Sequence, residues 1–229
     1  MPVLFKKRML WFPTLWGFLL CSSIIVLCLI LLFKNIANYL SENQQINAQY
    51  LVVEGWLAEP ELIKAIDIFK QEDYQLLITT GGPDTSQVKP KYKSYADKAA
   101  AFILSTGFDK NRLVVIPTPA SAQDRTYLSA VMVRDWFKQN SVTAEFNILS
   151  EGVHSRRTHV LYKDAFGQNS KIGIIAAEPR NYDKSHWWRT STGAKSVLTE
   201  AIGLAWVTCC FRPPQQGSHE EKWGGLPQE

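Results

Sequence analysis

The sequence lacks the motifs of several common enzyme classes. It contains no glycine-rich dinucleotide fingerprint (GxGxxG), no phosphate-binding loop of the GxxxxGK type, no GxSxG nucleophile elbow and no HExxH zinc motif. Each motif arranges particular groups around a phosphate, an acyl carbon or a zinc ion. Ordinary nicotinamide, nucleoside-triphosphatase, lipase and zinc-protease activities therefore lose their best support, and the sequence assigns no cofactor.

Cysteine is also scarce, with four residues in a chain of 229. Cys21 and Cys28 lie in an apolar N-terminal stretch, and Cys209 and Cys210 are neighbours near the end of the last apolar segment. There is no CxxC pair, which removes zinc-ribbon and thioredoxin-type sites, and no metal site is expected. Because neighbouring cysteines rarely bridge, we expect no disulfide.

From residue 42 onward, the chain has no excess of positive charge. Lys6, Lys7, Arg8 and Lys34 precede the first acid, Glu42, and they account for the entire formal charge of +4. The rest of the chain is balanced. A protein that binds nucleic acid concentrates basic residues on its folded domain, so we expect no nucleic-acid partner.

Residues 9–33 contain no charged side chain. About 20 apolar residues, at roughly 1.5 Å each in a helix, match a hydrocarbon core about 30 Å thick. A cleaved signal peptide is the alternative, but its apolar region is about 7–15 residues long and ends at a small-x-small site. None follows Phe33, where the next residues are Lys34, Asn35 and Ile36.

We therefore predict a retained transmembrane helix over residues 9–34 that anchors the protein in a bacterial cytoplasmic membrane. Three basic residues precede the span and one follows it, which places residues 1–8 in the cytoplasm and the following domain on the outer face. The polar residues 35–48 are predicted to form a stalk. Residues 212–229, rich in proline and glycine, are predicted to be a disordered tail.

Between stalk and tail, five short apolar runs alternate with helical patterns. The runs are residues 50–54, 76–80, 113–116, 146–149 and 172–176. Continuous apolar runs are typical of parallel strands covered on both faces. Residues 49–211 are therefore predicted to form an α/β domain: a three-layer sandwich around a five-stranded, mostly parallel, Rossmann-like sheet.

Local signals place the helices between these strands. Ser94 with Asp97, and Ser121 with Asp124, have the spacing of capping boxes. A further helix is expected to begin at Ser155 and end at Gly167, and a last one to cover residues 195–209.

Glycines, basic residues and hydroxyl residues follow the predicted strands. In a parallel sheet these positions lie at the carboxyl edge, where ligands bind. Gly55, Gly81 and Gly82 would let a ligand approach the backbone, or would simply allow tight turns.

Arg125 and Thr126 open one predicted helix, where a cation is badly placed against the helix dipole unless an anion binds. Ser155 and Arg157 open another beside His154, and this group would also suit a phosphate or carboxylate. Salt bridges are the alternative role for these basic residues.

Taken together, the segments at residues 54–56, 80–82, 121–126 and 154–157 resemble the SanA/YdcF/ElyC family of envelope proteins. The segment at residues 187–191, together with Glu200, is similar to bacterial members. The chain differs from the commoner pattern in having Leu128 where an acid often lies. The resemblance implies a YdcF-like domain and a part in envelope biogenesis without an agreed reaction.

Three hypotheses about function follow. The domain binds or acts on a phosphate-bearing envelope intermediate, such as a lipid-linked cell-wall precursor. In that case His154 donates or accepts a proton near neutral pH, with Asp124 as a reserve acid. Alternatively, it is a non-catalytic integrity factor that acts through protein partners, or, by resemblance, it binds adenosylmethionine or a nucleotide. Under the first hypothesis, His154→Ala and Arg157→Ala are expected to abolish function without loss of stability.

Overall fold

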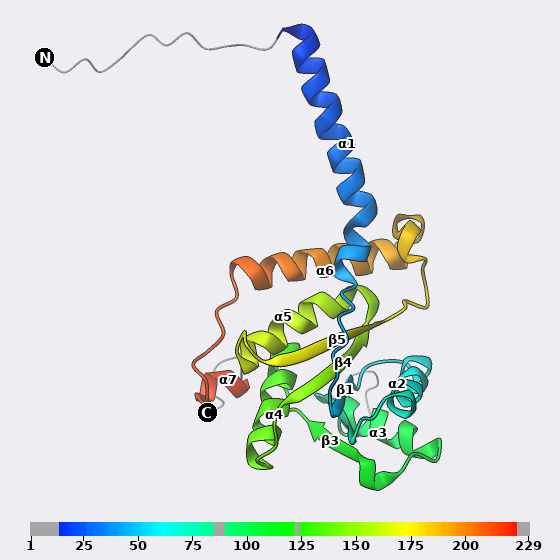
Figure 1. Ribbon diagram of the computed structural model, residues 1–229, viewed down its shortest axis with the longest axis vertical. Helices are drawn as coiled ribbons and strands as arrows, with labels where there is room; N and C mark the ends of the chain where they lie inside the picture. The colour runs from blue at the N-terminus through cyan, green and yellow to red at the C-terminus, as the bar shows by residue number, and fades with distance from the viewer. Residues whose placement is uncertain (1–13, 85–89, 122–123, 224–229) are drawn as a thin grey trace, which may run out of the picture. The chain divides into compact units, whose positions relative to one another are not determined.

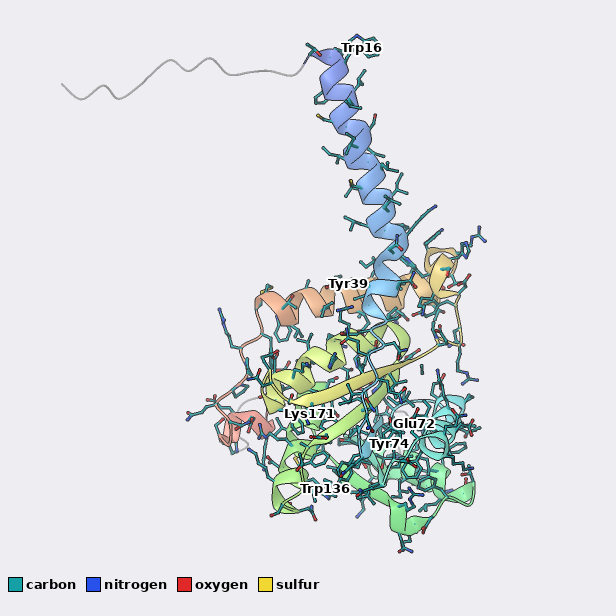
Figure 2. All side chains as sticks on the ribbon, in the orientation of Figure 1. Trp16, Tyr39, Glu72, Tyr74, Trp136 and Lys171 are labelled. Atoms are coloured by element: carbon teal, nitrogen blue, oxygen red, sulfur yellow. A yellow bond between two sulfur atoms is a disulfide. The ribbon has the colours of Figure 1, made fainter. Side chains whose placement is uncertain are left out.

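The computed structural model describes residues 14–84, 90–121 and 124–223, and the chain divides into two compact units, residues 1–36 and 37–229. Most of the first unit is helix α1 (Leu15–Leu40), which is long and apolar enough to cross a membrane. The large apolar side chains of this helix from Leu15 to Phe33 are exposed, as Figure 2 shows around Trp16. The length and composition of the helix fit a single membrane anchor or a signal sequence.

The second unit is built on a five-stranded sheet, as predicted (Figure 1). All neighbouring strands are parallel, and their order is β3-β2-β1-β4-β5. The strands are β1 (Tyr50–Glu54), β2 (Leu76–Gly81), β3 (Leu113–Pro117), β4 (Glu145–Glu151) and β5 (Lys171–Ala177). Every residue of the central strand β1 is buried, because helices cover both faces of the sheet.

Two helix layers enclose the sheet. Along β1, Leu51 and Val53 pack with α2 (Glu59–Gln71) and α3 (Tyr95–Ser105). Tyr50 and Val52 point the other way and pack with α4 (Arg125–Gln139) and α5 (Ser155–Phe166). The remaining elements are η1 (Lys110–Arg112), η2 (Gly152–His154), η3 (Lys184–Arg189), α6 (Ser191–Cys209) and α7 (His219–Trp223).

One predicted capping box is confirmed and the other is wrong. The Ser94 hydroxyl accepts a hydrogen bond from the backbone N–H of Asp97 at 3.0 Å and so caps α3. Helix α4 begins instead at Arg125, because Asp124 adopts a left-handed backbone conformation (φ 53°) and makes no side-chain cap. The predicted box needed Asp124 three residues inside the helix.

The predicted stalk is wrong, because the segment that follows α1 is part of the folded domain. Ala37 and Leu40 are buried, and Gln44 pairs with Ile174 at the edge of the sheet. The Asn147 side chain, in the middle of β4, bonds to both the backbone N–H and the C=O of Ile46. A side chain at position 173 would collide with this crossing segment, which explains the glycine there.

The predicted disordered tail is wrong for residues 212–222. Glu221 is buried, and its carboxylate accepts hydrogen bonds from Arg134 of α4 at 2.5 and 2.7 Å. A buried cation on α4 therefore fixes α7 against the domain. Residues 224–229 lie outside the described part of the chain.

The expectation of no disulfide is also wrong. Cys209 and Cys210 are joined to each other where α6 ends. Cys210 has left the helical conformation (φ −130°, ψ −27°), and the change of direction brings the two neighbouring thiols together.

Candidate functional site

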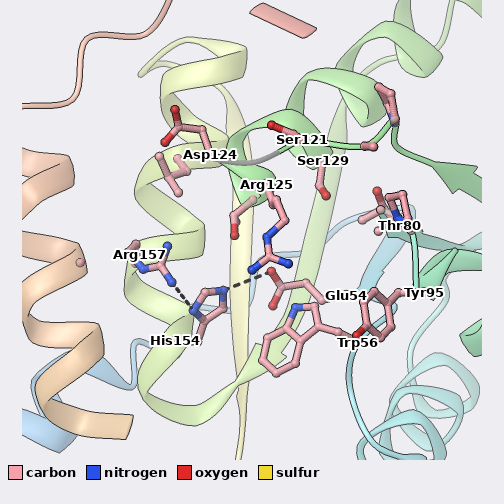
Figure 3. Close-up of a pocket in the computed structure, with 18 of the residues that line it drawn as sticks. Glu54, Trp56, Thr80, Tyr95, Ser121, Asp124, Arg125, Ser129, His154 and Arg157 are labelled. Carbon is pink, nitrogen blue, oxygen red and sulfur yellow. Dashed lines mark hydrogen bonds and ion pairs between the residues drawn. The ribbon is translucent and has the colours of Figure 1, made fainter. Parts of the chain in front are cut away.

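The candidate site lies at the carboxyl ends of β1 and β4. These strands are neighbours, but the chain continues from β1 to β2 on one side and from β4 to β5 on the other. In parallel α/β sheets the loops diverge at such a point and leave a crevice. A cavity of about 590 Å³ occupies it here, and Figure 3 shows side chains from several strand ends turned into it.

The cavity gathers seven of the nine residues predicted from the sequence. The residues that line it are Gly81, Gly82, Asp124, Arg125, Thr126, His154 and Arg157. Three of the predicted residues are basic, so the structure brings Arg125, His154 and Arg157 to a single concave surface. Residues 122 and 123, which follow Ser121 in the predicted capping box, lie outside the described part of the chain.

Gly55 and Ser155, which were also predicted to bind the ligand, are not among the residues that line the cavity. A Cβ at Gly55 would lie 2.5 Å from the backbone oxygen of Tyr95, so glycine is required for α3 to pack closely on this turn. Ser155 is completely buried and donates its hydroxyl to the backbone carbonyl oxygen of Glu42 at 2.9 Å. Its role is to hold the segment that enters the domain.

Glu54, the last residue of β1, is buried beneath the cavity (Figure 3). Ser150 donates a hydrogen bond to one carboxylate oxygen at 2.5 Å, and Thr158 donates to the other at 3.2 Å. His154 Nε2 lies 3.5 Å from the same oxygen as Thr158. Hydrogen bonds and an adjacent cation are what a buried carboxylate needs in order to remain charged.

Glu200, from α6, contacts the other side of the His154 ring. Its Oε2 atom lies 3.1 Å from His154 Nδ1 and accepts a hydrogen bond from Arg157 Nε at 2.8 Å. Arg157 Nη2 donates to Glu200 Oε1 at 3.0 Å, which completes a two-point pair. One carboxylate thus binds both of the basic residues contributed by the β4–α5 turn.

The two carboxylates determine the charge of His154. Burial alone would lower its pKa, but the negative charges of Glu54 and Glu200 and their hydrogen bonds raise the pKa to about 9. Burial would raise the pKa of Glu200, whereas bonds from His154 and Arg157 lower it to about 2. The carboxylates therefore favour the imidazolium at neutral pH, with Nε2 facing Glu54 and Nδ1 lying between Glu200 Oε2 and Arg157 Nη2, which is 3.0 Å away.

Asp124 occupies the opposite wall of the cavity. Burial raises the pKa of its carboxyl group, and its side chain makes no capping hydrogen bond to α4. It is therefore free of the capping role that the sequence suggested. A carboxyl group with a raised pKa is suited to holding a proton within a site.

Arg125 differs from the other two basic residues. Figure 3 shows its guanidinium turned into the cavity beside Glu54 and His154. Within the part of the chain that the structure describes, it has neither an ion pair nor a hydrogen bond. It also lies in the first turn of α4, where the helix dipole opposes a positive charge. An anion bound between Arg125 and the N-terminus of α4 would explain why this cation lies in the first turn of the helix and has no partner among the described residues.

Sequence reasoning missed Glu54 and Glu200 as members of the site. Each gave a signal, because Glu54 is an acid at the end of a wholly buried strand and Glu200 is the one acid of α6. Trp56 and Trp206 also line the cavity, with the Trp56 ring edge-on to His154 at 5.3 Å. Among residues 14–84, 90–121 and 124–223, no group of three His, Cys, Asp or Glu side chains is arranged to hold a metal ion.

The shifted pKa of His154 predicts a pH-dependent stability. A folded-state pKa of about 9 against 6.5 means that the imidazolium stabilises the fold fully below pH 6.5 and loses this effect as the pH rises through 9. Glu200 contributes above pH 4.5 and loses its effect as the pH falls towards 2. The thermal midpoint should therefore fall between pH 6.5 and 9, and a His154→Gln variant should lack this step. If the thermal midpoints of the wild type and the His154→Gln variant differ by the same amount at pH 6.5 and at pH 9, the assignment of the raised pKa to His154 is contradicted.

Comparison of the chain with protein-family models gives no match, and comparison with curated proteins gives no significant one. The functional argument therefore rests on the geometry of the cavity and on the residues of this chain.

Proposed function

We propose that the outer domain binds a phosphate-bearing or other anionic ligand in the cavity between β1 and β4, as a membrane-anchored protein of envelope biogenesis. The observation that carries this proposal is Arg125, a cation that points into the cavity without a carboxylate partner in the described residues. The His154 imidazolium lies on the same surface but is paired with Glu54 and Glu200. Arg125 is therefore the cation available to a ligand with at least one negative charge.

The remaining groups fit such a ligand. Gly81 and Gly82 line the cavity without a side chain, and Thr126 adds a hydroxyl group. His154 is protonated at neutral pH, and its two ring nitrogens face Glu54 and Glu200, so transfer of its proton to a phosphate oxygen or a leaving group requires a ligand that replaces one of these carboxylates. If the protein catalyses a reaction, His154 acts as the acid and not as the base.

The proposal places the chain in a bacterial cytoplasmic membrane, with a retained anchor and the domain on the outer face. Burial of Ala37 and Leu40 supports retention, because a cut just after the apolar run would leave the segment that enters the domain at a free end. The basic residues before the apolar run support an N-terminus inside the cell. The resemblance to the SanA/YdcF/ElyC family supports an envelope role and a lipid-linked cell-wall precursor as the ligand.

Replacing Arg125 with alanine is expected to weaken anion binding while leaving the fold unchanged. One charge-assisted contact contributes about 1.5–3 kcal/mol, equivalent to roughly a 10- to 100-fold change in affinity. Arg125 is exposed and has no described partner, so the thermal midpoint should stay close to that of the wild type. The measurement is calorimetric titration of the full chain, in detergent, with inorganic pyrophosphate as the probe.

Lys138→Ala is the matched control, because Lys138 is an exposed cation at the far end of the same helix. It should bind pyrophosphate as the wild type does. If both variants lose the same affinity for pyrophosphate, the effect is due to the overall charge of the protein and not to the position of Arg125. Absence of saturable binding by the wild-type protein would contradict the proposed function.

A second candidate is a non-catalytic envelope factor that acts through protein partners. The pairing of Arg157 and His154 with Glu200 favours it, because these basic groups are satisfied without a ligand. Under this hypothesis Arg125→Ala supports cell-envelope integrity as well as the wild-type protein does. Under the anion-binding hypothesis the variant fails in the same complementation assay.

A further inference from the structure

Helix α6 exposes an apolar stripe to solvent. Leu198, Ile202 and Trp206 follow one another at intervals of four residues and are 51%, 71% and 47% exposed. This spacing puts them on one face of the helix. The opposite face packs on the domain through Val197, Leu204 and Val207, so the stripe is not needed for the core.

The exposed charged residues within α6 and next to its ends are basic. Arg189, Lys195 and Arg212, before, within and just after α6, are exposed. Glu200 is the one acid between residues 189 and 212, and it is bound to Arg157 on the inner side of the helix. An apolar face bordered by basic residues and without acids is the pattern of helices that lie in a membrane interface.

The stripe lies at the end of the domain where the chain enters from α1. The first turn of α5 connects the two: Ser155 donates to the backbone carbonyl of Leu40, and Arg157 pairs with Glu200 of α6. Between them, Arg156 stacks on the ring of the exposed Tyr39 and donates to its carbonyl oxygen. Three consecutive residues thus join the entry segment to α6.

The sequence keeps this end of the domain close to the apolar run. Phe33 ends that run, and Ala37 is already buried in the domain. Four residues span about 6 Å as a helix and at most about 14 Å when extended. A bilayer around the apolar run therefore lies within reach of the entry segment and of the residues joined to it.

We propose that the outer face of α6 docks on the lipid bilayer in which the chain is anchored. Leu198, Ile202 and Trp206 enter the boundary between headgroups and acyl chains, and the flanking basic residues contact anionic headgroups. Trp206 also lines the cavity, so docking brings one cavity wall to the membrane surface. The inference rests on the proposed anchoring, and the experiment tests the two separately.

The test uses the full chain in vesicles of phosphatidylethanolamine and phosphatidylglycerol, with Cys21→Ala and Cys28→Ala to remove the free thiols. Reductant is omitted, which preserves the Cys209–Cys210 disulfide. A nitroxide label is attached after Ile202→Cys or, as the matched control, after Ile63→Cys. Ile63 is an exposed isoleucine on α2, which covers the opposite face of the sheet from α5.

Collisions of the label with oxygen and with a water-soluble nickel complex report its surroundings. The proposal expects the ratio of oxygen to nickel accessibility to be severalfold higher at position 202 than at position 63. Equal ratios, or free access of nickel to position 202, would overturn docking. Dipolar broadening at position 202 that disappears on dilution with unlabelled protein would identify a second copy as the occupant and also overturn it. Carbonate extraction tests anchoring alone, because an unanchored chain leaves the membrane fraction.

Discussion

Replacement of His154 by alanine should lower the free energy of unfolding of the α/β domain by about 3–5 kcal/mol, the usual cost of removing one partner of a buried ion pair. Glu54 is 4% exposed, and among the described residues His154 is its one cationic partner. The variant would leave this carboxylate with the hydroxyl groups of Ser150 and Thr158 alone. This result differs from the expectation drawn from the sequence, in which His154→Ala left stability unchanged. Chemical denaturation of the full chain in detergent measures the difference.

Two variants identify the cause of this loss. Adding Glu54→Gln to His154→Ala removes the unpaired charge and should restore part of the stability. His186→Ala removes a histidine whose partner, Asp183, is exposed to solvent, so it should change the stability little. If the double variant is no more stable than His154→Ala alone, the charge of Glu54 is not the source of the loss.

Replacement of Glu221 by alanine should also cost about 3–5 kcal/mol, although Glu221 is far along the chain from the sheet. Arg134 is 3% exposed, and both of its terminal nitrogens donate hydrogen bonds to the carboxylate of Glu221. Loss of Glu221 leaves a buried guanidinium with the partly exposed Asp135 and releases α7 from α4. The measurements are the free energy of unfolding and the rate at which protease removes the C-terminal segment.

The matched control is Lys222→Ala. Lys222 pairs with Asp135 at 2.9 Å but is 42% exposed, so its loss should cost about 1 kcal/mol or less. A double variant, Arg134→Met with Glu221→Leu, replaces the buried pair with apolar side chains and should recover most of the stability. Equal effects of Glu221→Ala and Lys222→Ala would show that burial of the pair is not what stabilises this end of the chain.

The strands were predictable from the sequence because each one is determined by the apolar residues of its own short run. A continuous apolar run such as residues 50–54 indicates a strand buried on both faces wherever it lies in the chain. The Ser94 cap was predictable for the same reason, since its hydrogen bond joins residues three apart. The capping box predicted at Ser121 does not form. Asp124 has a positive φ, and α4 begins only after it.

The partners of the site residues were not predictable from local patterns. Glu54 binds groups on β4 and α5, and Glu200 reaches the same turn from α6. The order of the strands decides these contacts, because it places β4 beside β1. Composition misled in a similar way at residues 212–222, where Glu221 pairs with the buried Arg134 of α4 and Gln216 donates a hydrogen bond to the backbone carbonyl of Ala165 in α5.

The way in which the chain enters the domain has a mechanical consequence. Tension applied through the N-terminal segment would reach β1 only after the hydrogen bonds of Gln44 with Ile174 and of Ile46 with Asn147 had broken. These bonds join the entry segment to β4 and β5, so a load would spread over both strands instead of pulling β1 out of the sheet. The domain should therefore resist unfolding when it is pulled from its N-terminus, and Asn147→Ala should lower the force at which it unfolds.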